Sequence, residues 1–331
     1  MTCCVIPAYK ASSSICGVVR STLAFVDIVI VVDDACPERS GEAVSKEFSG
    51  NPRVLVIHRA TNGGVGAAVK TGLAKCLELD PSVVIKIDAD GQMDPSYVPS
   101  IIACFDADPS LAYVKGNRFV NPLILRTMPK IRLFGNAVLS LLVKFASGYW
   151  NLLDPTNGYV AFNGRMLPDL GWQNFADSYF FEISVLGELG LRQLPIGEIE
   201  MAPLYGNERS SLSIRWALWE FPGKILRLFL RRMLLQYFLF DVNLGSIYLF
   251  WGAILVLSGI GLGTAEWIQT DITHQPRSAG TIMLVALPLL IGAQLLLNAL
   301  MYDVQFSPKT ARELGTRAKE VRNTADVRTL G

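Results

Sequence analysis

The sequence is poor in residues that bind zinc or close disulfides, and it carries almost no net charge. Its 331 residues include two histidines and six cysteines, and all six cysteines lie in the first third without a C-x-x-C pair. A typical zinc site needs four such ligands at short spacings, so that chemistry is excluded and reduced cytosolic thiols are the simplest interpretation. The net charge of +1 gives no reason to expect a nucleic-acid partner.

Hydrophobic residues, in contrast, are in excess. They make up 51% of the chain, too many for an ordinary soluble enzyme, and the excess lies in the C-terminal third. Residues 244–265 and 279–301 contain no charge, and roughly 20 apolar residues span a bilayer. Core helices rarely stay apolar all round for this length, so we expect two transmembrane helices and an integral membrane protein.

The charges around these spans predict their orientation. Lys and Arg cluster before residue 244 and after residue 301, whereas Arg277 is the only fixed positive charge between the spans. By the positive-inside rule the domain that precedes the spans and both termini should be cytoplasmic. Gln294 and Asn298 lie one turn apart, so that face should meet another helix, in the same chain or in a neighbour, which allows a homo-oligomer.

Short apolar runs alternate with helical patterns in the N-terminal half. The runs cover residues 5–9, 28–34, 54–58 and 83–87. This alternation predicts an α/β fold with a parallel sheet covered on both faces. In such sheets ligands bind at the carboxyl ends of the strands.

Two carboxylates follow the fourth run, in the sequence Asp88-Ala-Asp90-Gly-Gln92. Alone, such a pair is often a solvated turn, and its context must decide. At the end of a buried strand, Asp88, Asp90 and Gln92 can converge on one hard cation, so we predict Mg²⁺ or Mn²⁺ as the cofactor.

Seven short motifs resemble glycosyltransferase family 2 on a GT-A fold, and the dolichol- or polyprenyl-phosphate sugar synthases in particular. The motifs are I-P-A-Y (6–9), V-V-D-D (31–34), N-G-G-V-G-A-A (62–68), D-A-D-G-Q-M-D-P (88–95), G-N-R (116–118), D-P-T-N-G-Y (154–159) and Y-F-F-E (179–182). The resemblance covers about residues 3–212. One departure is Ala35-Cys36-Pro37, where the family usually shows Gly-Ser.

This resemblance implies inverting transfer of a sugar from a nucleotide sugar to undecaprenyl or dolichyl phosphate at the cytoplasmic membrane face. It assigns nucleotide-sugar binding to Pro7, Ala8, Tyr9, Asp33, Asp34, Asp88, Ala89 and Asp90. It assigns catalysis to Asp154, Arg118 and Arg132. Arginine suits a lipid phosphate because its planar fork binds two oxygens. Glu182 either faces the sugar or packs in the core.

Four segments follow from these patterns. We expect a GT-A domain over 1–212, juxtamembrane helices over 213–241, the two spans within 242–302 and a cytoplasmic tail over 303–331. Pro222 should divide the juxtamembrane segment into two helical pieces, lying in the membrane interface or packed against the catalytic domain. Residues 133–150 should form an amphipathic helix near the acceptor groove.

Two alternative functions and the role of one turn stay open at this level. One is a glycosyltransferase that extends a lipid-linked oligosaccharide or a polysaccharide, although Leu212 stands where processive synthases carry the Gln of Q-x-x-R-W. Another is a non-catalytic membrane scaffold. The turn at Gly64 and Gly66 is no dinucleotide fingerprint, since Val69 replaces the third glycine. It is either a helix start near a nucleotide or a packing turn.

Overall fold

The computed structural model describes residues 1–118, 130–201 and 214–311, and only the backbone of residues 130–132 and 214–219. The chain divides into two compact units, which we treat separately. The α/β unit comprises Met1–Phe229 and Pro308–Gly331, and the hairpin unit comprises Leu230–Ser307. The predicted domain boundary at residue 212 lies outside the described residues, as does the predicted tail beyond residue 311.

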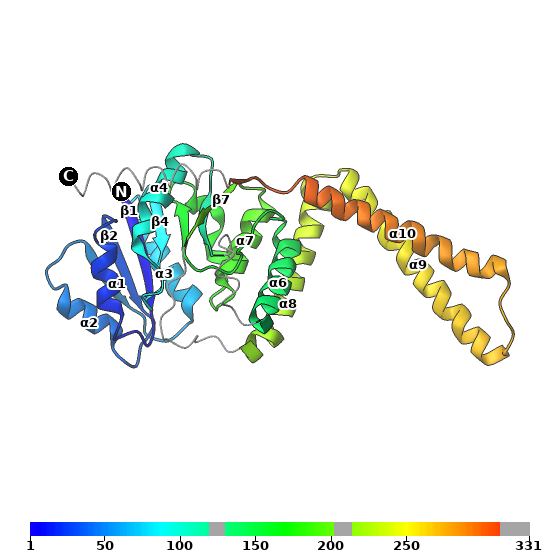
Figure 1. Ribbon diagram of the computed structural model, residues 1–331, viewed down its shortest axis with the longest axis horizontal. Coiled ribbons are helices and arrows are strands. Elements are labelled where there is room, and N and C mark those ends of the chain that lie inside the picture. The colour runs from blue at the N-terminus through cyan, green and yellow to red at the C-terminus, as the bar shows by residue number, and fades with distance from the viewer. Residues whose placement is uncertain (119–129, 202–213, 312–331) are drawn as a thin grey trace. The chain divides into compact units, whose positions relative to one another are not determined.

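An eight-stranded sheet forms the centre of the α/β unit (Figure 1). Its strands are β1 (Thr2–Ala8), β2 (Ile28–Asp33), β3 (Val54–His58), β4 (Val83–Lys86), β5 (Tyr113–Asn117), β6 (Val160–Asn163), β7 (Ile196–Glu200) and β8 (Thr310–Ala311). Their order is β3-β2-β1-β4-β6-β5-β7-β8, and β6 pairs antiparallel with both neighbours while the other pairs are parallel. The prediction of a mainly parallel sheet is confirmed.

Helices cover both faces of this sheet, because its strands are apolar on both sides. They are α1 (Ile15–Thr22), α2 (Ser40–Glu47), α3 (Val65–Leu77), α4 (Val98–Ala107), α6 (Lys130–Ser147) and α7 (Phe181–Leu191), with short 3₁₀ turns at η1 (Pro95–Tyr97), η2 (Leu167–Leu170) and η3 (Trp172–Asn174). One core lies under α1, α2 and α4. The other lies under α3, α6 and α7. All six cysteines are free thiols.

The segment that follows forms a single helix, α8 (Ile214–Leu234), which continues through Pro222. The prediction that Pro222 separates two helical pieces is therefore wrong. A proline inside a helix costs about 3 kcal/mol. Phe221 and Ile225, on either side of it, are buried in the core that also contains α7. Burying two such side chains contributes about 1.5–3 kcal/mol each, which offsets the proline.

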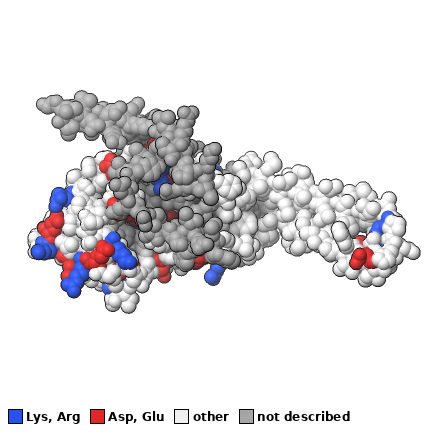
Figure 2. All heavy atoms as spheres, turned by 60° about the horizontal axis from the view of Figure 1, so that its bottom comes forward, with Lys and Arg blue, Asp and Glu red and all other residues white. Residues whose placement is uncertain are grey.

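The hairpin unit contains two long apolar helices, α9 (Leu244–Thr273) and α10 (Ala279–Gln305). Both are long and apolar enough to cross a membrane, and the protein is membrane-anchored. Gly252 and Gly259 of α9 lie against Leu296 and Leu289 of α10, so the absence of side chains lets the helices approach closely. The hairpin surface is uncharged over most of its length and carries charged atoms at its loop end (Figure 2).

An ion pair closes the base of the hairpin unit. The Arg232 guanidinium, just after the unit begins, binds Asp303 of α10 through two hydrogen bonds of 2.7 and 2.9 Å. The Tyr237 hydroxyl, in the π-helical segment η4 (Leu235–Phe240), donates to the same carboxylate at 2.7 Å. A buried carboxylate with three such bonds ties α10 to the segment that enters the hairpin.

The polar face of α10 is exposed at Gln294, whose Nε2 donates to Asn298 Oδ1 over 3.3 Å. In the hairpin unit α9 packs on a different face, the one that carries Gly292. A neighbouring helix at Gln294 therefore stays a prediction.

Candidate active site

Most of the predicted site residues lie at one edge of the sheet, where the parallel strands end. β1 ends at Ala8, β2 at Asp33, and Asp88 comes two residues after β4. Arg118 follows β5 directly. Because β6 runs antiparallel, the turn before it, which contains Asp154, reaches the same edge. The predicted donor and acceptor residues are thus brought to the edge where α/β sheets bind ligands.

Two carboxylates occupy the turn after β4. The Asp88 side chain is 31% exposed, and its Oδ1 lies 2.6 Å from the ammonium of Lys86. The Asp90 Oδ1 accepts a hydrogen bond from the Gln92 backbone N–H at 3.0 Å, which tightens the turn. Asp88 is therefore held by the buried Lys86, while Asp90 is fixed by a hydrogen bond within its own turn.

The electrostatics of this turn suit a divalent cation. The pKa of Asp88 is raised overall, with burial as the largest cause. Lys86 lowers this pKa, and the neighbouring carboxylates of Glu182 and Asp90 raise it. In the described ranges no three His, Cys, Asp or Glu side chains form a complete metal site. Mg²⁺ and Mn²⁺ are commonly held by one or two carboxylates and complete their shell with water and substrate phosphates. Asp88 and Asp90 therefore fit such an ion, and with Gln92 they stay its predicted ligands.

The paired acids after β2 bind backbone. Asp33 accepts from the N–H groups of Cys36 and Gly41 at 2.7 and 2.6 Å. Asp34 accepts from the N–H groups of Gly63 and Gly64, the latter at 2.8 Å, and pairs with Arg59. Both carboxylates are buried. They shape the edge of the sheet, and their contact with a nucleotide stays a prediction.

The glycine turn after β3 packs closely on another loop. At Gly66 a Cβ atom would lie 2.0 Å from the carbonyl oxygen of Ala176. Gly64 has a φ of +94°, which favours glycine, and its Cβ would meet the carbonyl oxygen of Asp177. These contacts support the packing-turn interpretation.

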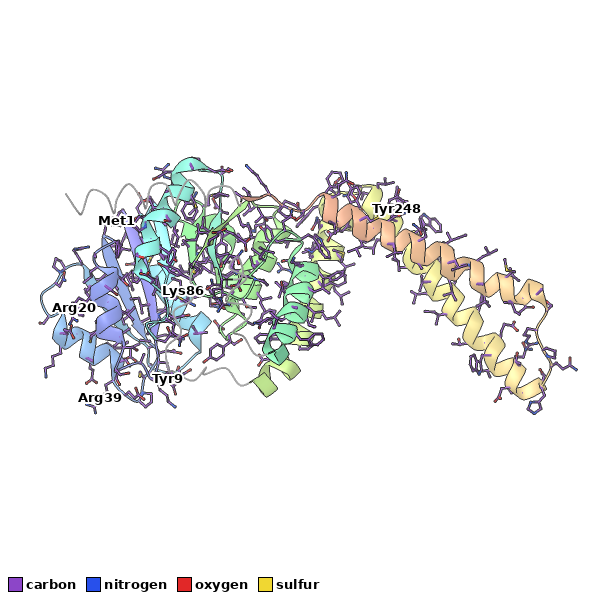
Figure 3. All side chains as sticks on the ribbon, in the orientation of Figure 1. Met1, Tyr9, Arg20, Arg39, Lys86 and Tyr248 are labelled. Atoms are coloured by element: carbon purple, nitrogen blue, oxygen red, sulfur yellow. The ribbon has the colours of Figure 1, made fainter. Side chains whose placement is uncertain are left out.

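The end of β1 presents one exposed aromatic ring. Tyr9 is 47% exposed and lies at the periphery of the α/β unit (Figure 3). The Lys10 ammonium is 5.5 Å from its ring centroid. Ala8, next to Tyr9 in sequence, and Ala89, between Asp88 and Asp90, are both buried, so they can contact a ligand mainly through backbone.

A bidentate ion pair forms the other half of the site. Arg118 Nε donates to Asp154 Oδ2 at 2.8 Å and its Nη2 donates to Oδ1 at 3.1 Å. The Arg118 backbone N–H adds a bond of 3.2 Å to Oδ2. Asp154 is fully buried, whereas the Arg118 side chain is 35% exposed. The carboxylate therefore orients the guanidinium, and the guanidinium is the group that can meet a ligand.

Three charged side chains and one valine lie in one row across the sheet. The row runs from Lys86 through Val160 and Lys115 to Glu198, which are register partners on β4, β6, β5 and β7. Register partners point to the same face, and Val160 belongs to the core that contains α7. Glu198 Oε1 accepts from the backbone N–H of Asp154 at 3.4 Å and of the residue before it at 3.1 Å.

A groove of about 350 Å³ runs along α6. Its lining residues are Leu133, Asn136, Ala137, Ser140, Leu141, Lys144 and Leu153. Leu153 directly precedes Asp154. The predicted helix over residues 133–150 is confirmed as α6 from Lys130 to Ser147. Arg132 lies in its first turn, but its side chain is outside the described residues.

The model of the family described as glycosyl transferase family 2 matches residues 3–169, about half of the chain. The chain belongs to glycosyl transferase family 2. It is a glycosyltransferase, and the predicted resemblance is confirmed.

Named relatives act on lipid phosphates. The chain is 31% identical to a UDP-N-acetylglucosamine–dolichyl-phosphate N-acetylglucosaminyltransferase of Methanococcus voltae, over 61% of this chain and 84% of that protein. It is 31% identical to an undecaprenyl-phosphate mannosyltransferase of Micrococcus luteus, over 65% and 95%. It is 27% identical to a polyprenol monophosphomannose synthase of Mycolicibacterium smegmatis, over 68% and 89%.

Sequence reasoning missed three charged residues of this glycosyltransferase, Lys86, Lys115 and Glu198. All three are buried in strands. The available signal was a charge inside a run that is otherwise apolar or small, as in Val83-Val-Ile-Lys86. Such a charge is costly unless it is paired. Lys86 pairs with Asp88 two residues on, but its second partner, Glu182, comes from a distant segment that the pattern does not show.

We predict an alkaline limb in the pH profile of transfer, set by Lys115. The pKa of Lys115 is lowered to about 8, mainly by burial. The carboxylates of Asp154, Glu198 and Glu182 raise this pKa, and Arg118 lowers it further. Below pH ~8 the ammonium balances these carboxylates, and above it the countercharge is lost. The rate should therefore fall as pH rises through about 8.

The test compares initial rates from pH 6.5 to 10 in the wild type and in Lys115→Arg, whose charge does not titrate in this range. The limb should move to higher pH in the variant. Thermal unfolding checks that the variant is folded. An unchanged limb in a folded variant would assign the titration to another group.

Proposed function

We propose that the protein transfers a sugar from a nucleotide sugar to a polyprenyl phosphate, with Mg²⁺ or Mn²⁺ as cofactor and with inversion at the anomeric carbon. The named relatives act on dolichyl, undecaprenyl and polyprenol phosphates, which supports this acceptor class. The sugar and the nucleobase are left open.

One observation carries the acceptor assignment. Leu153 lines the groove along α6 and directly precedes the buried Asp154, which binds the partly exposed Arg118. A groove with apolar lining residues, joined through Leu153 to the carboxylate that holds a guanidinium, suits a molecule with an apolar chain and an anionic head. The isoprenoid would lie along α6, and the phosphate would bind Arg118 through the bidentate geometry of arginine. Arg132, at the start of α6, is proposed as a second phosphate ligand.

On the donor side, Tyr9 would contact the nucleobase through its exposed ring, with Asp33 and Asp34 near the base or ribose. Asp88 and Asp90 would hold the metal ion with Gln92. A bound divalent ion neutralises charge on a leaving diphosphate as a Lewis acid. Backbone at Pro7, Ala8 and Ala89 would complete the donor pocket.

In the proposed reaction an oxygen of the lipid phosphate attacks the anomeric carbon, and the nucleoside diphosphate departs from the opposite face. A phosphate monoester is already largely ionised at neutral pH, so no strong base is needed. Asp154 is bound to Arg118 and its role is to hold that guanidinium toward the phosphate. This positions the nucleophile, which is a large part of the barrier reduction in such displacements.

The assay uses membranes that contain the protein, a panel of radiolabelled nucleotide sugars and added polyprenyl phosphate, followed by butanol extraction. Label should enter the butanol phase as a lipid-linked monosaccharide with one donor, in proportion to added lipid. Label in a water-soluble polymer would favour the polysaccharide alternative. Absence of transfer and of donor hydrolysis with every donor would favour the scaffold.

We further propose that the hairpin places the α/β unit and both termini in the cytoplasm. Cysteines are introduced singly at Thr273, the exposed end of α9, and at Thr316 in the tail, in a background without native cysteines. An impermeant thiol reagent on intact cells should label position 273 and leave position 316 unlabelled. Labelling at 316 without permeabilisation would contradict the orientation. Labelling at 316 after permeabilisation is the positive control.

A further inference from the structure

A lysine is buried beneath the donor carboxylate of the proposed site. Lys86 is 2% exposed and lies inside the sheet (Figure 3). Its ammonium is 2.6 Å from Asp88 Oδ1 and 3.0 Å from Glu182 Oε1. An apolar side chain would suit this position, since Val84 and Val160 beside it belong to the core. A charge buried here destabilises the fold unless it is paired, so the ammonium needs its contacts with the two carboxylates.

The two carboxylates come from different parts of the fold. Asp88 follows β4, and Glu182 lies in the first turn of α7. The helix N-terminus already favours a negative charge at Glu182. Asp88 is not in a helix, and among the described residues Lys86 is the cation that contacts it.

The turn from Asp154 to Tyr159, called the acceptor turn here, packs against Lys86, Asp88 and Glu182. At Gly158 a Cβ atom would lie 2.8 Å from Lys86 Nζ, 3.0 Å from Asp88 Oδ2 and 3.3 Å from Glu182 Oε1. The turn that starts at Asp154 thus packs its backbone against the ammonium and both carboxylates. Lys86 therefore contacts the donor carboxylate, α7 and the acceptor turn at one point.

We propose that Lys86 is a positioning residue for the transfer reaction: it fixes the Asp88 carboxylate against Glu182 and the acceptor turn, so that the donor group is set before donor and metal bind. This inference rests on the proposed function, in which Asp88 binds metal and donor. Lys86 itself touches neither substrate. It acts through Asp88, as residues behind a metal ligand commonly do.

The test uses Lys86→Met, Glu182→Gln and the double variant, with Lys75→Met as a control. Lys75 is also paired with a glutamate, Glu78, but on the surface of α3, so its loss should leave kcat and KM unchanged. Calorimetry measures the affinity of a nucleoside diphosphate in the presence of Mn²⁺, kinetics give kcat and donor KM, and thermal unfolding reports the fold.

Lys86→Met should weaken Mn²⁺-dependent diphosphate binding about 10–100-fold and lower kcat, as for other residues behind a metal ligand. The single variant also leaves the mostly buried Glu182 without its cation and should be less stable. In Lys86→Met/Glu182→Gln that unpaired charge is gone, so the unfolding temperature should recover. Diphosphate affinity should not recover, because Asp88 still lacks its contact.

Recovery of both diphosphate affinity and kcat in the double variant would overturn the proposal, because Lys86 would then serve only to neutralise Glu182. Failure of the proposed function would look different. The unmodified protein would then show no metal-dependent binding of any nucleoside diphosphate, which would overturn the function and this inference together.

Discussion

Transfer activity should fall about a thousandfold when Asp90 is replaced by alanine, while the protein stays folded and membrane-inserted. Asp90 contributes its carboxylate at the ligand edge of the sheet, where it is bound by the Gln92 backbone N–H of its own turn. Loss of a proposed metal ligand removes charge stabilisation worth several kcal/mol, and about 4 kcal/mol corresponds to a thousandfold in rate.

Initial rates in saturating Mg²⁺ or Mn²⁺ measure this effect. Asp106→Ala is the matched control, since Asp106 is an exposed aspartate on α4 and should behave as wild type. Excess EDTA should stop the unmodified enzyme, and re-added metal should restore it. Full turnover in EDTA would contradict the metal assignment, even if Asp90→Ala were inactive.

The second large effect is expected at the acceptor side. Asp154→Asn should lower transfer to polyprenyl phosphate about 100-fold, because the amide cannot hold Arg118 through two charge-assisted bonds. Arg118→Lys should lose a similar factor, since an ammonium has no planar fork. Binding of the nucleoside diphosphate with metal should change little in both variants.

Calorimetry with the nucleoside diphosphate separates the two halves of the site. If donor affinity fell in step with the transfer rate, Asp154 and Arg118 would belong to the donor site and our division would be wrong. The polyprenyl-phosphate KM of Arg118→Lys is a further readout, because a residue that binds the acceptor phosphate should raise it.

Much of the α/β fold can be predicted from the sequence. The runs that became β1 to β4 are nearly continuous in Val, Ile and Cys, and such runs are typical of strands buried on both faces. The two apolar spans were equally clear, because length and lack of charge identify them without further context. Both features depend on local pattern alone.

The direction of β6 could not be predicted in this way. Its four residues, Val160-Ala-Phe-Asn163, are all buried, so they show no alternation that would mark a sheet position or a direction. Yet this strand decides the site, because its reversal brings the turn with Asp154 to the edge that holds Asp88. The motif could be recognised by resemblance, whereas its placement required the sheet order.

Tertiary contacts explain two further features that the sequence did not show, the continuity of α8 and the hydrogen bonds of the paired acids after β2. Pro222 did not end α8, because Phe221 and Ile225 are buried on either side of it. The nucleotide-binding role of Asp33 and Asp34 stays a prediction, and the sequence did not show that their carboxylates also accept hydrogen bonds from backbone N–H groups that follow in the chain. A local pattern reports residue type and spacing, and it contains no information on which distant group will contact the side chain.

The strand β8 has a consequence for the order of assembly during synthesis. It pairs with β7 at the edge of the sheet, and Lys309 just before it accepts a backbone bond from Ile196 at 3.0 Å. In the chain, however, α9 and α10 lie between β7 and β8. The ribosome therefore completes both apolar helices before it makes the last strand. Until then the outer edge of β7 stays open, so the sheet can be finished only after the membrane hairpin has emerged.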